Sequence, residues 1–351
     1  MTSWKLLLVC LIALSANIVT AQDKFVRVGI LGFDNYQGLA FAQLFNNPKA
    51  EGDLTGVKVT TVFPVECPDY PESAALTKRW IDSCARWGTG DNKVLKEYHP
   101  VKMVTSIDEL LANVDAVMIC SLDGRLHVKQ AETVLKAGKR LFLTRPLAAS
   151  LADAQAIFKL AEQSGTPMFS CSQHRYSPGF SGMRNHPEVG KVLGCDVYGG
   201  FEIKGPAADE FIRPLHSLET IYAIMGPGVE RVTCTSTDTA ESITLVWNDG
   251  RVGTYRGIKS GAVKYSATVF GDKGVSTAGI YGHGVPVQGV VPTKDKYMGY
   301  EGVAIEIAKF FKGGPTPVAP AETLEIFGVL AAAEKSRAQS GTTIRVADML
   351  K

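Results

Sequence analysis

Residues 25–38, FVRVGILGFDNYQG, constrain the fold of this chain more than any other segment. The segment begins with a short apolar run rich in β-branched residues, which predicts a buried strand. Glycines stand at Gly29, Gly32 and Gly38, and the apolar-rich residues 39–45 predict a helix. A strand, a glycine turn and a helix in this order are typical of a dinucleotide-binding unit, in which backbone approaches a pyrophosphate at the helix N-terminus.

The turn departs from the dinucleotide fingerprint at its centre. From Gly32 the sequence reads G-F-D-N-Y-Q-G, whereas the fingerprint is G-x-G-x-x-G. Asp34 replaces the second glycine and would bring negative charge toward a pyrophosphate, and one extra residue precedes Gly38. Asn35 and Tyr36 offer polar groups that could anchor a phosphate instead.

The second predicted strand, residues 57–63, lacks the acid that usually binds the ribose hydroxyls of NAD. Phe63 and Pro64 stand at its end, and Glu66 follows slightly later. Glu66 is our candidate for the ribose contact, and a solvated loop carboxylate is the alternative.

Strands and helices then alternate up to about residue 172, which predicts a parallel, doubly wound sheet with ligands at the carboxyl ends of its strands. Beyond residue 192 the pattern changes to strands separated by turn signals such as Asn248-Asp249-Gly250. This pattern predicts a second, α+β domain with a mostly antiparallel sheet. We expect the first domain to span residues 22–147 and the second residues 148–351, with the last helix packing back on the first.

The N-terminal residues are typical of a secretory signal peptide. Lys5 precedes the apolar residues 6–14, and small residues end at Ala21. The apolar stretch is too short to span a bilayer, although a membrane anchor is the alternative. We expect residues 1–21 to be removed and the protein to be exported by the Sec-type route, because no twin arginine is present.

Six cysteines follow the predicted signal peptide. Cys67 and Cys84 flank one loop region and are our predicted disulfide pair, because an exported protein can form disulfides. The alternative is that most of the six are small buried thiols. No His/Cys spacing indicates a zinc site.

The chain has 351 residues, of which 45% are hydrophobic, and a formal net charge of +2. This length allows two domains with sizeable cores. The small net charge does not favour nucleic acid or an anionic membrane as a partner.

Residues 121–147, SLDGRLHVKQAETVLKAGKRLFLTRPL, resemble the glucose–fructose oxidoreductase / inositol dehydrogenase / MocA family (Gfo/Idh/MocA). Members have a histidine that opens this helix, an A-G-K turn, an apolar strand and a Glu-Lys-Pro triplet. His127, residues 137–139 and Pro146 match this pattern. The resemblance continues at residues 173–178 and 190–194, and His216 is similar to the family's catalytic histidine.

The resemblance implies a Rossmann domain, a second domain with a large open sheet, NAD(P), and hydride transfer to or from a sugar or cyclitol. Family members often pair through the second sheet, so we expect a homo-oligomer. The cofactor contacts expected from the turn and from the resemblance are Gly29, Gly32, Asp34, Asn35, Tyr36, Gly38, Glu66, Ser121 and His127.

The expected catalytic residues are His216, as acid/base, and Arg145, which stands where the family has lysine. Histidine suits proton transfer because its pKa is near neutral. Arginine stays protonated, so Arg145 cannot act as an acid/base but can hold an anionic or hydroxylated ligand. Arg175 and Asp209 complete the expected substrate-binding set.

Three functions remain open at this point. The first is an NAD(P)-dependent oxidoreductase acting on a sugar or cyclitol. The second is a cofactor-independent exported member, either a carbohydrate-binding protein or a non-redox hydrolase or lyase. Asp34 and Arg145 favour the second function, as does the signal peptide, because a chain exported unfolded carries no NAD(P). The third is a structural subunit.

Overall fold

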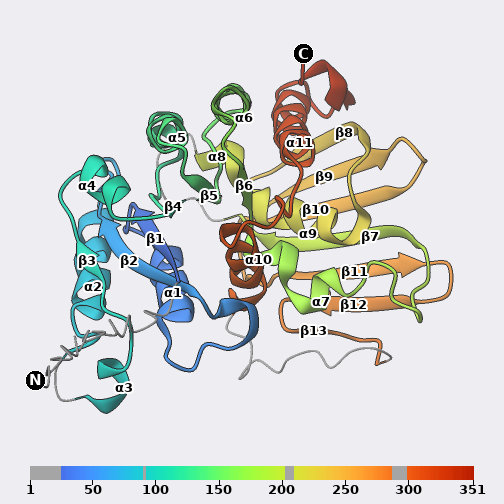
Figure 1. The fold of residues 1–351 in the computed structure, drawn as a ribbon. Helices are drawn as coiled ribbons and strands as arrows, with labels where there is room; N and C mark the ends of the chain where they lie inside the picture. Colours follow the sequence, from blue (N-terminus) through green and yellow to red (C-terminus); the bar gives the residue numbers. More distant parts are fainter. Residues whose placement is uncertain (1–24, 90–91, 202–208, 287–298) are drawn as a thin grey trace, which may run out of the picture.

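The computed structural model describes residues 25–89, 92–201, 209–286 and 299–351. The predicted signal peptide, with its Cys10, lies outside these residues. Two sheets lie side by side, each with its own helices (Figure 1). The first is parallel and the second mostly antiparallel, which confirms the predicted fold class.

The first sheet has six parallel strands in the order β3-β2-β1-β4-β5-β6. The strands are β1 (Val26–Leu31), β2 (Val57–Phe63), β3 (Lys102–Met103), β4 (Ala116–Ile119), β5 (Arg140–Thr144) and β6 (Met168–Cys171). The strand order reverses between β1 and β4, and ligands of such sheets bind at this switch point. Because β6 pairs with β5, the sheet extends past residue 147, where we expected the first domain to end.

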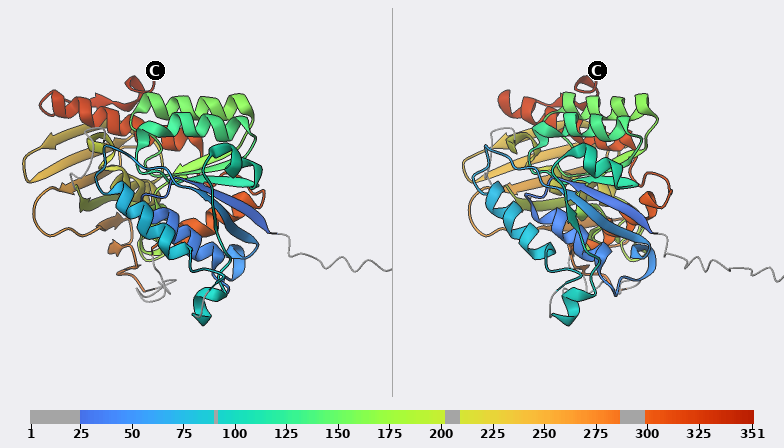
Figure 2. Two further views of the ribbon diagram at one scale, coloured as in Figure 1. Left: turned by 90° about the vertical axis from the view of Figure 1, so that its left-hand side faces the viewer. Right: turned by 60° about the vertical axis from the view of Figure 1, so that its left-hand side comes forward.

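Helices cover both faces of the first sheet (Figure 2). One face carries α1 (Tyr36–Asn46) and α2 (Ser73–Cys84), with the short α3 (Lys93–Lys96) nearby and α10 (Glu301–Phe311) packed in the same core. The other face carries α4 (Ile107–Ala112), α5 (His127–Lys136) and α6 (Leu151–Ser164). Burial on both faces explains why β4 is apolar at every position.

The second sheet has eight strands in the order β13-β12-β11-β7-β10-β9-β8-β14, and only β7 and β10 pair in parallel. The strands are β7 (Val192–Gly200), β8 (Val229–Ser236), β9 (Ala240–Trp247), β10 (Val252–Ile258), β11 (Ser266–Gly271), β12 (Val275–Gly279), β13 (Gly282–His283) and β14 (Ile344–Arg345).

Two helices cover one face of the second sheet. They are α9 (Leu215–Met225) and α11 (Pro320–Ala338), and α11 also packs against α6 of the first domain. The short helices α7 (Pro178–Ser181) and α8 (Asp209–Ile212) lie in the connections before α9. Large apolar side chains on the strands of this sheet are exposed at Val252, Phe270 and Val275.

Across the described ranges, no helix combines the length and apolarity needed to cross a membrane.

The predicted disulfide between Cys67 and Cys84 is wrong, because both residues are free thiols. Cys84 ends α2 and lies in the core shared with Trp80. The Cys67 thiol instead donates to the Asp123 carboxylate at 3.3 Å. The other four cysteines of the described ranges are also free and buried, as the alternative interpretation predicted.

Gly32 lets the turn after β1 lie directly on the turn after β4. Its φ is +85°, and a Cβ added there would stand 2.3 Å from the backbone nitrogen of Ser121. Both the left-handed conformation and the contact therefore require glycine at this position.

We expect Gly32→Ala to destabilise the protein by about 3 kcal/mol or more, because it adds a clash to an unfavourable φ. Gly52→Ala is the matched control, since Gly52 has φ +58° but open space around it. The control should lose only about 1 kcal/mol. Urea unfolding of both variants measures the difference, and equal losses would show that the contact is unimportant.

Candidate functional site

A cavity of about 300 Å³ lies between the two domains. The first domain contributes Tyr70, Leu122, Arg145 and Pro146 to its wall, and the second contributes Gly200, Ile212, Arg213, Leu215, His216 and Tyr265. Leu122 and Arg145 follow the carboxyl ends of β4 and β5, as expected for a ligand site of a parallel sheet. The structure therefore brings together the two predicted catalytic residues, Arg145 and His216.

His216 is held by the residue that follows β6. The Oγ of Ser172 lies 2.6 Å from Nδ1 of His216, and the Ser172 amide donates to Oε1 of Glu219 at 3.2 Å. The His174 ring packs on the His216 ring with 4.6 Å between centroids. These contacts fix the imidazole through Nδ1, and the residue lines the cavity.

The surroundings keep both imidazoles neutral. Burial lowers the pKa of His216 well below its usual value, and the Arg145 charge and His174 lower it further. Burial, followed by the Arg145 charge, lowers the pKa of His174 to about 3. His216 is therefore neutral near neutral pH and has one unprotonated ring nitrogen.

The structure gives Arg175 a structural role instead of the expected substrate contact. Its guanidinium donates to Glu219 at 2.6 Å and to Glu322 at 2.5 Å, and the side chain is 9% exposed. Arg175 is absent from the cavity wall. The ion pairs connect the segment after β6 to α9 and α11, and so support the position of His216.

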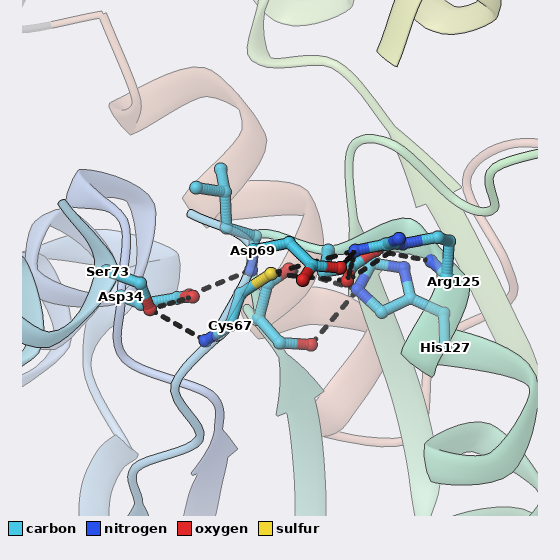
Figure 3. Close-up of polar contacts among 9 residues, drawn as sticks. Asp34, Cys67, Asp69, Ser73, Arg125 and His127 are labelled. Carbon is cyan, nitrogen blue, oxygen red and sulfur yellow. Dashed lines mark hydrogen bonds and ion pairs between the residues drawn. The ribbon is translucent and has the colours of Figure 1, made fainter. Parts of the chain in front are cut away.

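Asp34 is buried in the turn between β1 and α1, with only 1% of its surface exposed (Figure 3). Its carboxylate accepts hydrogen bonds from the Leu122 amide at 2.8 Å and from the Ser73 hydroxyl at 2.9 Å. Burial raises the pKa of Asp34, and these two hydrogen bonds oppose the rise. The carboxylate thus joins the turn after β1 to the turn after β4 and to the start of α2.

Asn35 caps α1 at the position where a pyrophosphate would accept hydrogen bonds. Its Oδ1 accepts from the Gln37 amide at 2.8 Å, and its Nδ2 donates to the Cys120 carbonyl at 2.5 Å. A pyrophosphate needs backbone donors at this helix start and no opposing charge nearby. The described turn, with Asn35 on the Gln37 amide and Asp34 beside it, does not fit that group.

Residues 64–73, which we call the strap, connect β2 to α2 across the carboxyl ends of β1 and β4 (Figure 3). Arg125 donates to Asp69 at 2.7 Å and to Asp123 at 2.6 Å, and the Cys67 thiol contacts the same Asp123. The strap also supplies Tyr70 to the cavity wall. It therefore connects the turn at Asp34 to the candidate ligand site.

Most of the other predicted cofactor residues have packing roles. His127 is fully buried, with Nδ1 3.2 Å from the Leu147 carbonyl and Nε2 3.0 Å from the Ser121 carbonyl, and burial lowers its pKa. The Ser121 hydroxyl donates to Gln130 at 2.7 Å. These contacts join the turn after β4 to the segment after β5 and engage both ring nitrogens of His127 with backbone carbonyls.

Gly29 and Gly38 allow close packing inside the first domain. A Cβ at Gly29 would lie 3.0 Å from Leu110, and one at Gly38 would lie 2.8 Å from the Phe33 ring. In the structure these two glycines therefore allow close packing around the first sheet and its helices, whereas we predicted contacts with a cofactor.

Three further predicted residues lie away from the cavity wall. Glu66 is exposed, and Tyr36 is 45% exposed with its ring edge against Trp80. Asp209 begins α8, and its side chain lies outside the described residues.

Sequence reasoning missed Tyr70, Ser172, Arg213 and Tyr265. Ser172 follows a predicted strand, and this position at the carboxyl end of the strand could have identified it as a residue near the site. The others come from connections and from the second sheet, where no local pattern marks them.

The parallel sheet, its glycine turn and the adjoining antiparallel domain define a two-domain protein built on a dinucleotide-binding fold. Residues 86–171 match the sequence model of the Gfo/Idh/MocA oxidoreductase family, which has an NAD-binding Rossmann fold. The predicted resemblance is therefore confirmed. The matched segment begins after the glycine turn.

Two curated relatives match a limited part of the chain. 4-Carboxy-2-hydroxymuconate-6-semialdehyde dehydrogenase from Sphingobium sp. is 30% identical over 102 residues, which is 28% of this chain and 32% of the relative. Myo-inositol dehydrogenase Hyg17 from Streptomyces leeuwenhoekii is 26% identical over 100 residues, which is 28% of this chain and 31% of the relative. The matched segments thus span about a third of each relative.

Solved structures share the fold over nearly the whole chain. One example is an oxidoreductase from Agrobacterium radiobacter in complex with NAD+, L-tartaric acid and magnesium. It superimposes with a TM-score of 0.66 and 14% identity over 92% of this chain and 99% of that chain.

We expect Glu219→Ala to destabilise the protein by about 3–5 kcal/mol, because it leaves the buried Arg175 with one carboxylate fewer. Glu132→Ala is the control, because Glu132 pairs with Lys136 on the surface of α5. Its removal should change stability by less than about 0.5 kcal/mol. Urea unfolding of both variants at neutral pH tests this, and a small loss for Glu219→Ala would contradict the structural role of the ion pairs.

We also expect acid to destabilise the protein through its buried histidines. The pKa values of His127, His174 and His216 are lowered in the folded state, so the unfolded state binds more protons below about pH 6.5. Stability is then lost as the pH falls, and His174, whose pKa is lowered to about 3, accounts for about 2 kcal/mol of this loss at pH 5. His174→Gln should reduce the difference between unfolding free energies at pH 7 and pH 5 by about that amount. An unchanged difference would contradict the neutral state of His174.

Proposed function

We propose that this protein is an oxidoreductase that acts on a hydroxyl group of a sugar or cyclitol in the cavity between the domains. NAD(P), which the family's Rossmann fold binds, is the proposed hydride acceptor or donor. The observation that carries the proposal is the neutral His216, fixed by Ser172 and placed beside Arg145 in one cavity wall. The match to myo-inositol dehydrogenase supports a cyclitol or a related polyol.

The cavity suits a small hydroxylated ligand. Its volume of about 300 Å³ is at the lower end of ligand-binding pockets, which favours a ligand of monosaccharide size. Tyr70 and Tyr265 supply ring surfaces to its wall, and Arg145 and Arg213 supply hydrogen-bond donors.

His216 and Arg145 have different tasks in this proposal. Nε2 of His216 accepts the proton of the reacting hydroxyl in the neutral tautomer whose Nδ1–H donates to Ser172 Oγ. Arg145 orients the substrate oxygen and stabilises negative charge on it, since its guanidinium keeps its proton.

His216→Asn should lower kcat about 10²–10⁴-fold, because it removes the proton acceptor. The assay follows nicotinamide reduction with a panel of inositols and monosaccharides, after calorimetric titration of NAD+ and NADP+. His99→Asn is the control, because His99 contacts Pro100 and the Phe25 ring and is absent from the cavity wall. Full activity of His216→Asn would assign the base to another residue.

A second candidate function is cofactor-independent binding of a carbohydrate or non-redox chemistry on it. The buried Asp34 carboxylate favours this candidate, because the turn does not fit a pyrophosphate. The titration described above separates the two functions. Sugar binding without any binding of millimolar NAD(P) would support the second candidate.

Export and self-association complete the proposal. Residues 1–21 support export through a cleaved signal peptide, and the exposed apolar side chains of the second sheet support a homo-oligomer.

A further inference from the structure

The Asp34 carboxylate stands in the turn at which a dinucleotide-binding fold takes the pyrophosphate of its cofactor. It is buried and already accepts hydrogen bonds from the Leu122 amide and the Ser73 hydroxyl. The Gln37 amide near the start of α1 is likewise engaged, by Asn35. Asp34 and the Gln37 amide are therefore already engaged by groups of the protein itself, and Figure 3 shows the contact of Asp34 with Ser73.

The same carboxylate would repel a bound pyrophosphate. Two negative charges a few ångströms apart inside a protein repel strongly, because water screens them poorly there. Asp123 lies close enough to raise the pKa of Asp34 through its own charge. A cofactor bound in the turn would place its negatively charged phosphates close to Asp34 and Asp123.

The strap is held in place by polar contacts, and it buries little surface. Ser73 bonds to Asp34, Cys67 to Asp123 and Asp69 to Arg125. Of the ten residues 64–73, only Cys67 and Ser73 are buried. Segments with few buried contacts open at low free-energy cost.

We propose that Asp34 is a resident anion that competes with the pyrophosphate of NAD(P), so that the cofactor binds only when the Asp34 carboxylate has left the turn and released Ser73 of the strap and the Leu122 amide. The inference rests on the proposed function, and it adds a control on that same site. Because Tyr70 belongs to the strap, loss of the contact between Ser73 and Asp34 also loosens the segment that supplies Tyr70 to the cavity wall. Cofactor binding and the shape of the substrate cavity are thereby coupled.

The experiment compares the affinity of the full chain and its variants for NAD+ and NADP+ by calorimetry. Asp34→Asn removes the charge and keeps an acceptor for the Leu122 amide, and Asp34→Gly restores the glycine of the fingerprint. Ser73→Ala removes the contact that the strap makes with Asp34. Asp82→Asn is the control, because Asp82 is an exposed acid of α2 that pairs with Lys78. Thermal unfolding establishes that each variant is folded.

Both Asp34 variants should bind NAD(P) about tenfold or more tightly than the wild type, and Asp82→Asn should bind like the wild type. Ser73→Ala should bind more tightly by a smaller factor, because the carboxylate remains. Hydrogen exchange supplies a second measurement, in which NAD(P) should speed exchange of amides in residues 64–73 and of the Leu122 amide.

Equal affinities of the wild type and the Asp34 variants would overturn the inference, and so would slower exchange in the strap on cofactor binding. Absence of binding in every folded variant would overturn it as well, because the carboxylate would then not be what limits the affinity. The proposed function fails separately, if NAD(P) binds but no inositol or monosaccharide is oxidised or reduced.

Discussion

The hydrogen bond from the Leu122 amide to the Asp34 carboxylate is the interaction on which the rest of the site depends. It joins the ends of β1 and β4, the two strands between which the sheet order reverses. Gly32 permits the close approach, because no side chain separates it from Ser121. His127 then connects the same turn to the segment after β5, which carries Arg145. A chain of buried polar contacts thus runs from the turn at Asp34 to the cavity.

The second domain attaches to this framework through a few polar residues. Ser172 holds His216 through Nδ1, and Glu219 accepts from both the Ser172 amide and Arg175. Buried ion pairs of this kind add little net stability, but removing one partner leaves a costly unpaired charge. Their value here is the fixed orientation of the imidazole relative to Arg145.

The sequence predicts the architecture well because its patterns are local. The first strand, the glycine turn and the first helix can be recognised within residues 25–45. Turn signals later in the chain indicate the change to an antiparallel sheet. Asp34 could also be recognised as an anomaly within the fingerprint. Its partners Ser73 and Leu122 could not be predicted, because they lie 39 and 88 residues further along the chain.

The residues that the structure places away from the predicted site have long-range partners for the same reason. Arg175 follows a strand end and resembles a substrate ligand, but Glu219 and Glu322, which pair with it, lie 44 and 147 residues away. Arg213 and Tyr265 reach the cavity through the packing of a second domain that no local motif describes.

Ser172 has one more consequence for how this molecule moves. Because it follows β6 of the first sheet and holds His216 of the second domain at 2.6 Å, the two domains cannot rotate apart without breaking that bond. Many two-domain enzymes admit their ligands by opening a hinge between the domains. Here such an opening would break the contact that orients the imidazole, so opening the domains and releasing His216 from its fixed position are one event.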